Sequence, residues 1–227
     1  MTRNAASPSE LDRSAAIANL GRVFDLGVTR ERILAAAITS LADHGFGAFT
    51  VREVAATAGI KAPGLYSHFP SKEAILTEAV SRVLGDFLDT ATHVAGLDPE
   101  SDLREAVRQH VLYQMHNMDI ARVADLVLYT ATAGQFLSSD DYDRLLSLQR
   151  THLNLVRDRV TAFAPEVSAA NVTVASMAII SMCDRVASWF PADGALSPDD
   201  IADLHWQLVR AMLIGFSPTV QAAPPPA

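Results

Sequence analysis

The chain has 227 residues, of which 49% are apolar, and a formal net charge of −8 at pH 7. This length and composition suffice for one large folded domain, or for a small domain and a larger one. The N-terminus lacks the apolar stretch of a secretory signal and no run approaches roughly 18 uninterrupted apolar residues, so we expect a cytoplasmic protein. Cys183 is the only cysteine, which excludes an internal disulfide and a cysteine-based zinc cluster and predicts a small buried side chain.

The acidic excess is confined to the C-terminal part of the chain. Residues 1–80 carry eight basic and eight acidic side chains, whereas residues 81–227 carry ten basic and eighteen acidic ones. The two lysines, Lys61 and Lys72, lie eleven residues apart in one short segment. An anionic partner is therefore expected at this segment, although two lysines also fall close together by chance in a lysine-poor chain.

The first regular pattern follows an irregular N-terminal segment. Residues 1–27 have mixed character with glycine interruptions, and we expect a partly disordered extension. From Thr29 apolar residues recur at helical spacing, with Thr29 as the expected N-cap and Gly45 as the expected stop. A first helix is therefore predicted between these two residues.

Two short helices are predicted next. Thr50 and Glu53 have the spacing of a capping box, so a second helix should begin at Val51 and end before Gly59, which supplies the left-handed residue of a tight turn. A third helix is expected from Ala62 to Phe69, with proline in its first turn and a second proline after its end.

The rest of the chain predicts helix after helix, and we find no alternating strand pattern. Ser71 should cap the fourth helix, which continues to about Leu88. The last eleven residues, rich in alanine and proline, are expected to be disordered. The remaining predicted helices cover approximately residues 99–117, 120–136, 138–163, 169–189 and 198–215.

Two short helices joined by a four-residue turn with a glycine, behind a support helix, are typical of a DNA-binding helix-turn-helix. Leu65 and Phe69 should anchor the second helix, while its small residues face base edges in the major groove. Phosphate contacts would then fix the register. The candidate DNA-binding residues are Thr50, Arg52, Lys61, Ala62, Pro63, Gly64, Tyr66, Ser67, His68 and Lys72.

Two of these assignments have plain structural alternatives. Tyr66 could serve packing instead of a phosphate contact, and His68 could be a neutral surface residue. A helix-turn-helix can also be a packing unit without DNA, although the capping box, the turn glycine and the motif that follows argue against that interpretation.

Three stretches resemble the N-terminal signature of TetR-family regulators: TVREVA at 50–55, AGI at 58–60 and LYSHFPSKE at 65–73. The resemblance implies that the third helix binds DNA, that Tyr66 and Lys72 contact phosphates, and that a dimer leaves its operator when an effector binds. The commonest form of the family has Ser-Lys-Gly-Thr or similar where this chain has Lys61 to Gly64, which leaves the base preference open.

A second, weaker resemblance lies near the C-terminus. Residues 184–191 and 194–202 are similar to a segment of actinobacterial TetR regulators of lipid and sterol catabolism, several of which respond to acyl-CoA thioesters. Such a ligand would need cationic partners for its phosphates, and the candidates are Arg150, Arg157 and Arg185. The alternative, that these arginines pair with the acidic residues of the same region, is favoured by numbers alone.

The C-terminal helices should hold an effector pocket and a dimer interface. Aromatic and methionine side chains line adaptable apolar cavities, although each could equally be core. The effector candidates are Tyr113, Met115, Tyr129, Phe136, His152, Met177 and Met182. The last two helices have more apolar surface than one bundle face needs, which predicts a four-helix interface with a second copy. The interface candidates are Trp189, Trp206, Val209, Met212 and Leu213.

The predicted fold is therefore all-α, with a three-helix helix-turn-helix DNA-binding domain and a C-terminal helical bundle for ligand binding and dimerisation. Its expected parts are an extension at 1–27, the DNA-binding domain at 28–73, the effector and dimerisation domain at 74–216 and a tail at 217–227. The expected partners are double-stranded operator DNA, a small hydrophobic or amphipathic effector and a second copy, without a membrane.

An enzyme is not expected. The seven histidines form no pair at i, i+4 spacing, and the chain has neither a G-x-S-x-G motif nor a phosphate-binding glycine loop. We therefore predict no cofactor and no metal. The remaining alternative is a helical ligand-binding or interaction scaffold that does not bind DNA, and salt-dependent binding to palindromic DNA would discriminate the two.

Overall fold

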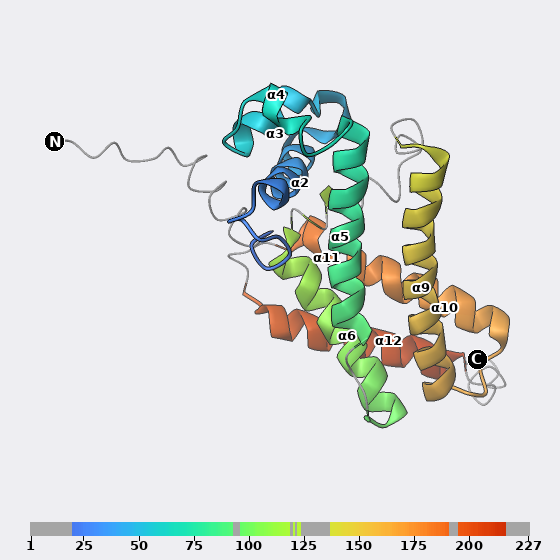
Figure 1. Ribbon diagram of the computed structural model, residues 1–227. Helices are drawn as coiled ribbons and strands as arrows, with labels where there is room; N and C mark the ends of the chain where they lie inside the picture. The colour runs from blue at the N-terminus through green and yellow to red at the C-terminus, as the bar shows by residue number, and fades with distance from the viewer. Residues whose placement is uncertain are drawn as a thin grey trace. The chain divides into compact units, whose positions relative to one another are not determined.

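The computed structural model describes residues 20–92, 96–118, 120, 122–123, 137–190 and 195–216, and every regular element in these ranges is a helix (Figure 1). The all-α prediction is thus confirmed. The predicted helix over 120–136 lies almost entirely outside the described residues, as do the tail and most of the N-terminal extension. None of the described helices combines the length and the apolar character that crossing a membrane requires.

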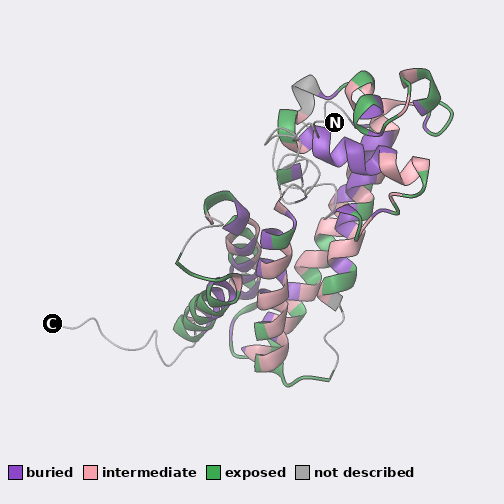
Figure 2. Ribbon diagram, turned by 90° about the vertical axis from the view of Figure 1, so that its left-hand side faces the viewer, coloured by how far each residue is buried: buried purple, intermediate pink, exposed green. Residues whose placement is uncertain are grey.

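The chain divides into two compact units. The first unit comprises Met1–Asp86 and Asn117–Leu146, and the second comprises Phe87–His116 and Ser147–Ala227. Both units contain buried residues, which are purple in Figure 2. Helix α5 (Lys72–Thr92), which begins next to the expected domain boundary after residue 73, contributes residues to both units.

The support helix of the first unit is α2 (Thr29–Ala48). It begins one residue earlier than expected, since the Arg32 N–H donates to the carbonyl of Val28, which takes the N-cap position. Gly45 has φ 67° and breaks the helical geometry as predicted, but helical structure resumes beyond it to Ala48. The apolar face of α2 is buried at Ile33, Leu34, Ala37, Ile38 and Leu41.

Helix α3 (Val51–Thr57) begins at the predicted cap, where the Thr50 hydroxyl accepts the Glu53 N–H at 3.3 Å. The Glu53 carboxylate does not complete the capping box; it lies 2.9 Å from Nδ1 of His44 on α2. The turn after α3 contains Gly59 at φ 70°, the left-handed residue that the sequence predicts there.

Helix α4 (Ala62–Leu65) is a single turn and so is shorter than the predicted 62–69. Beyond it the chain continues in turns, with the His68 and Phe69 N–H groups both donating to the Leu65 carbonyl. The Ser67 hydroxyl donates to the carbonyl of Gly64 at 2.7 Å, a local bond that competes with regular helix. Helix α5 then starts at its predicted cap, since Ser71 Oγ accepts the Ala74 N–H at 3.1 Å.

The second unit is built from α6, the greater part of α9, and three further helices. Their bounds are α6 (Pro99–His116), α9 (Ser139–Phe163), α10 (Ala169–Asp184), α11 (Val186–Trp189) and α12 (Pro198–Gly215). The helix expected over 169–189 is divided at Arg185, and the Ser188 hydroxyl donates to the Arg185 carbonyl at 2.7 Å just after the break. Cys183 lies fully buried in the core, as predicted, and burial raises the pKa of its thiol.

Helix α12 packs against α6 and begins with a complete capping box. Ser197 Oγ accepts the Asp200 N–H, and the Asp200 carboxylate accepts the Ser197 N–H. The Ser197 hydroxyl, which donates to Asp200 Oδ2 at 2.6 Å, and the Ser197 N–H together lower the pKa of Asp200. Exposed ion pairs join the two helices, each contributing at most about 1 kcal/mol. They are Arg104–Asp203, Arg108–Asp199 and Arg210–Glu100.

Candidate functional site

The predicted DNA-binding residues form an exposed surface over a buried base. Leu65 is fully buried and Phe69 nearly so, whereas Tyr66, between them, is 56% exposed. Ala62 and Lys72 are half-buried, and the other candidates are exposed: Thr50, Arg52, Lys61, Pro63, Gly64, Ser67 and His68. Buried Leu65 and Phe69 therefore anchor the segment that contains α4, and the polar side chains that flank this helix are exposed.

Phe69 is held in place by Arg30 of the support helix α2. The Arg30 guanidinium lies 4.4 Å from the centre of the Phe69 ring, a cation–π contact. Arg30 also makes a bidentate pair with Glu78 of α5, with Nη2 to Oε2 at 2.6 Å, and this pairing raises the pKa of Arg30. One arginine thus ties α2, α5 and the end of the recognition segment together.

The basic side chains of the first unit have two different roles. Arg30 pairs with Glu78 and Arg82 pairs with Glu31, while Arg32 donates hydrogen bonds to backbone carbonyls. Arg52 and Lys61 are exposed, and neither makes an ion pair with any residue that the structure describes. Charge counting in the sequence could not make this distinction, because the pairing partners lie about fifty residues away.

Gly64 leaves room at the tip of α4. A Cβ atom added there would meet nothing within 4 Å. The face that α4 presents beside Ala62 and Pro63 is therefore narrow, as a segment that approaches base edges closely must be.

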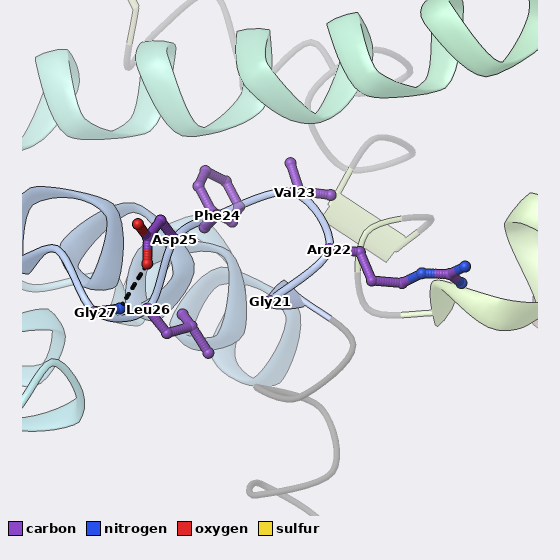
Figure 3. Close-up of a pocket in the computed structure, with 7 residues that line it drawn as sticks. All are labelled: Gly21, Arg22, Val23, Phe24, Asp25, Leu26 and Gly27. Carbon is purple, nitrogen blue, oxygen red and sulfur yellow. Dashed lines mark hydrogen bonds between the residues drawn. The ribbon is translucent and has the colours of Figure 1, made fainter.

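Part of the segment expected as an extension, residues 20–27, is described and precedes α2 directly. Leu20 and Phe24 are buried, and the Gly27 N–H donates to Asp25 Oδ1 at 2.9 Å (Figure 3). Residues 21–27 line a hollow of about 550 Å³, but all its walls come from this one loop. We assign it no ligand.

The predicted effector residues are dispersed. Tyr113 and His152 both contact the ring of Phe87, at centroid distances of 5.1 and 4.8 Å. Met115 belongs to the apolar core, and Met177 is 57% exposed and so lines no interior cavity. Met182 lines a surface groove, while Tyr129 and Phe136 lie outside the described residues.

A buried polar cluster was missed in the sequence. His110 Nε2 lies 2.8 Å from Asp184 Oδ1, and Gln114 Nε2 donates to the same oxygen at 2.9 Å. The available signal was a polar pair one turn apart, His110 and Gln114, on the face of α6 that carries Val107 and Val111. The partner carboxylate, 74 residues further along the chain, could not be assigned from spacing.

The predicted interface residues face in different directions. Trp206, Val209 and Leu213 are buried in the core of their own unit, so they have no surface to offer a second copy. Met212 is half-buried and Trp189 is 54% exposed. The exposed apolar residues of these helices are instead Val174, Met177, Trp189, Leu204, Leu208 and Ile214.

A groove of about 540 Å³ runs over this exposed face, bounded by α10, α11 and α12. Arg185, one of the three arginines predicted near the pocket mouth, lines it together with Met182 and Leu208. Arg150 is exposed, and the Nε of Arg157 is buried without a hydrogen-bond partner among the described residues.

A support helix, a glycine turn and a short exposed helix, followed by a second helical unit, define the helix-turn-helix regulator class. Residues 33–79 match the family described as "Bacterial regulatory proteins, tetR family". Residues 96–213 match the family described as "Tetracyclin repressor-like, C-terminal domain". The chain belongs to the TetR family.

Individual relatives resemble different parts of the chain. The HTH-type transcriptional repressor KstR2 of Mycolicibacterium smegmatis is 48% identical over 60 residues, which are 26% of this chain and 27% of that protein. The chain thus matches only about a quarter of that curated relative. A tetR-family regulatory protein from Rhodococcus RHA1 has 26% identity and a TM-score of 0.70, over 82% of this chain and 96% of that one.

A third relative was solved with its ligands. AibR in complex with isovaleryl coenzyme A and operator DNA has 20% identity and a TM-score of 0.68, over 80% of this chain and 97% of its own. At this identity the likeness concerns the fold.

Proposed function

We propose that the protein is a transcriptional repressor that binds a palindromic operator as a homodimer and leaves it when a small hydrophobic or amphipathic effector binds. The observation that carries this is the exposure of Lys61 and Tyr66 at the two ends of α4, whose Leu65 is buried, and of Arg52 on α3. Cations without an internal partner, next to a narrow helical tip, suit the phosphates and the major groove of duplex DNA.

In this proposal the exposed residues divide into two kinds. Tyr66 and Lys72 contact phosphates, as do Thr50 and Arg52, whereas Lys61, Ala62 and Gly64 lie nearest the base edges. Two-fold symmetry then places the paired α4 segments in successive major grooves about 34–36 Å apart. Such a protein acts where the bacterial chromosome lies, in the cytoplasm, and no catalytic activity is assigned to it.

The partner for the exposed face of α10, α11 and α12 is a second copy. Trp189 and Leu208 are large apolar side chains that remain more than half exposed in one protomer, and the groove beside them is apolar. Covering such a patch is favourable, and a dimer would cover it twice with the same residues. This replaces Trp206, Val209 and Leu213 in the proposed interface and keeps Trp189 and Met212.

The effector belongs in the second unit, and an acyl-CoA thioester is one candidate class. The support is indirect: AibR, which shares the fold, was solved with isovaleryl coenzyme A. Release from DNA requires that the effector bind a DNA-incompetent state more tightly than the DNA-competent one, and the coupling must be reciprocal.

The decisive experiment selects binding sites from random duplex DNA with the full-length protein and then measures affinity by fluorescence anisotropy across a salt series. We expect palindromic sites and an affinity that falls steeply with salt. Arg52→Ala and Lys61→Ala should weaken binding, whereas Arg210→Ala, which removes an exposed arginine of the second unit, should not. Failure to select any site, or equal weakening by all three substitutions, would favour the ligand-binding or interaction scaffold.

A further inference from the structure

The buried polar cluster of the second unit has unused hydrogen-bonding capacity. His110 is 5% exposed, and its Nε2–H donates to Asp184 Oδ1 at 2.8 Å. That bond commits Nε2 as the donor and leaves Nδ1 for another partner. No hydrogen bond joins Nδ1 to any residue that the structure describes, so this nitrogen is open to a further partner.

His152 of α9 packs against His110, and its ring nitrogens also have no hydrogen-bond partner among the described residues. The two ring centres are 5.1 Å apart, and both rings pack against Phe87 at 4.8 Å. Burial and the neighbouring His110 lower the pKa of His152 to about 3, so at neutral pH its ring carries one N–H donor and one acceptor.

These two imidazoles line a small cavity of about 20 Å³ between the end of α5 and helices α6, α9 and α10. This volume accommodates about one water-sized atom. Most of the wall is apolar, with Val107, Val156 and Ile179 among its residues. A group that enters it can therefore make polar contacts only at a few places.

The charges around the cavity are already balanced or negative. Arg159 also lines it, but its guanidinium donates to Asp102 Oδ1 at 3.2 Å and to the Ala91 carbonyl at 3.0 Å. The Asp184 carboxylate lies directly behind His110. An anion that enters the cavity would lose its hydration. It would meet only a carboxylate and a guanidinium that already has its own counter-ion, so no attraction would offset this loss.

We propose that this cavity binds one uncharged oxygen of the effector, from a hydroxyl or a carbonyl group, and that any charged group of the effector stays outside it. The inference rests on the proposed function, because it assigns the ligand chemistry of that regulator. His152 supplies the hydrogen bond to the oxygen, and Asp184 holds His110 in the orientation that closes the other side. An ionised carboxylate or a phosphate is excluded by charge and by size.

The test uses four eight-carbon probes that differ in their polar end: 1-octanol, 2-octanone, octanoate and octyl phosphate. Each is titrated into the full-length protein at pH 7.5 by calorimetry, and histidine ring ¹⁵N shifts are recorded. We expect 1-octanol and 2-octanone to bind and to shift the His152 ring nitrogens, with the two anions at least tenfold weaker. Absence of 1-octanol binding, unchanged His152 shifts, or equal binding of the anions would overturn the proposal.

Substitutions separate the hydrogen bond from packing. His152→Phe keeps an aromatic ring beside Phe87, and it should lower the 1-octanol affinity about five- to tenfold, the value of one hydrogen bond. His152→Gln, which restores a donor and an acceptor, should recover part of the loss, and His116→Gln, at an exposed position of α6, should change nothing. Wild-type affinity in His152→Phe would mean that the cavity holds only a structural water, and the proposal would be wrong.

Operator binding by the same preparations distinguishes this inference from the proposed function. Ligand-free wild-type protein and His116→Gln should bind the selected DNA with the same affinity and salt dependence. If 1-octanol binds as expected but no preparation binds DNA, the repressor function fails and the oxygen site stands. If DNA binds normally and the uncharged probes do not, the oxygen site fails alone.

Discussion

The two units place their polar groups in opposite ways. In the first unit Lys61 and Tyr66 are exposed on either side of the buried Leu65, and short local motifs determine their positions. In the second unit His110, Gln114 and Asp184 lie inside, held by bonds between helices. An exposed site can thus change its outer residues at little cost in stability, whereas a buried site couples ligand chemistry to folding.

The largest effect on the free energy of unfolding should come from the buried residues beneath the proposed DNA-binding surface. Phe69→Ala removes a buried ring held by Arg30 and should lower the free energy of unfolding by about 3–5 kcal/mol. Tyr66→Ala, three residues earlier and exposed, should change it by no more than about 0.5 kcal/mol. Urea unfolding followed by circular dichroism, at one fixed protein concentration, measures both. Equal losses of unfolding free energy in the two variants would show that Phe69 is not an anchor distinct from the exposed Tyr66.

The second effect concerns the proposed interface. Leu208→Arg places a charge on the exposed apolar face and should weaken the dimer by at least about 2 kcal/mol, roughly thirtyfold in the dissociation constant. Val209→Ala, at the next residue but buried, should lower unfolding stability and leave the dissociation constant nearly unchanged. Sedimentation velocity over a concentration series distinguishes them. A wild-type constant for Leu208→Arg, or a 24.4 kDa monomer at micromolar wild-type protein, would contradict the interface.

The third effect is a pH dependence of the buried site. The pKa of His152 is about 3 in the folded protein, against 6.5 for an ordinary histidine, so below pH 6.5 the unfolded chain binds a proton that the folded chain does not. The stabilisation is complete above pH 6.5 and is lost as the pH falls, by about 1.4 kcal/mol per pH unit well below that value.

Comparison with a variant isolates this contribution from those of His110, Asp184 and Arg159. Thermal and urea unfolding between pH 7.5 and 5 should show a shallower decline for His152→Phe than for the wild type. His116→Phe, at an exposed position, should keep the wild-type slope. Parallel curves for His152→Phe and wild type would indicate that His152 becomes charged in the folded protein at ordinary pH.

The smallest effects are expected on DNA binding, from substitutions in the proposed DNA-binding surface of the first unit. Lys72→Ala should weaken binding to operator and random DNA alike and reduce the salt slope by about 0.9 per subunit, since one fewer counterion is released. Gly64→Ala adds a methyl group in open space, so it should fold normally and alter the preferred sequence instead. Anisotropy with operator and scrambled duplexes measures both. A changed preference in Lys72→Ala with an unchanged salt slope would reverse the assignment.

The sequence predicted the first unit better because its signals are local. The Thr50 cap, the Gly59 turn and the Ser71 cap each depend on neighbours within a few residues, and all three are present. The length of α4 was overestimated because Gly64 and Ser67 weaken the helix within one turn. The pairing of Arg30 with Glu78 spans 48 residues, and no local pattern predicts it.

In the second unit the sequence predicted the helices but not which faces they bury. Val209 and Leu213 are apolar and so were equally consistent with a core and with an interface, until packing against α6 decided between them. Tyr113 and His152 were placed among effector residues by type alone, and their common contact, Phe87, lies on a helix far away in sequence. Long-range pairing is the information that periodicity lacks.

The burial of Cys183 makes the native protein almost inert to thiol reagents. Its thiolate is the reactive form, and both its raised pKa and its enclosure suppress that form. Because the chain has no other cysteine, a new one at the exposed Ser67 could carry a fluorophore on the DNA-facing surface without background labelling. In the unmodified chain, slow reaction of Cys183 would instead time each opening of the core of the second unit.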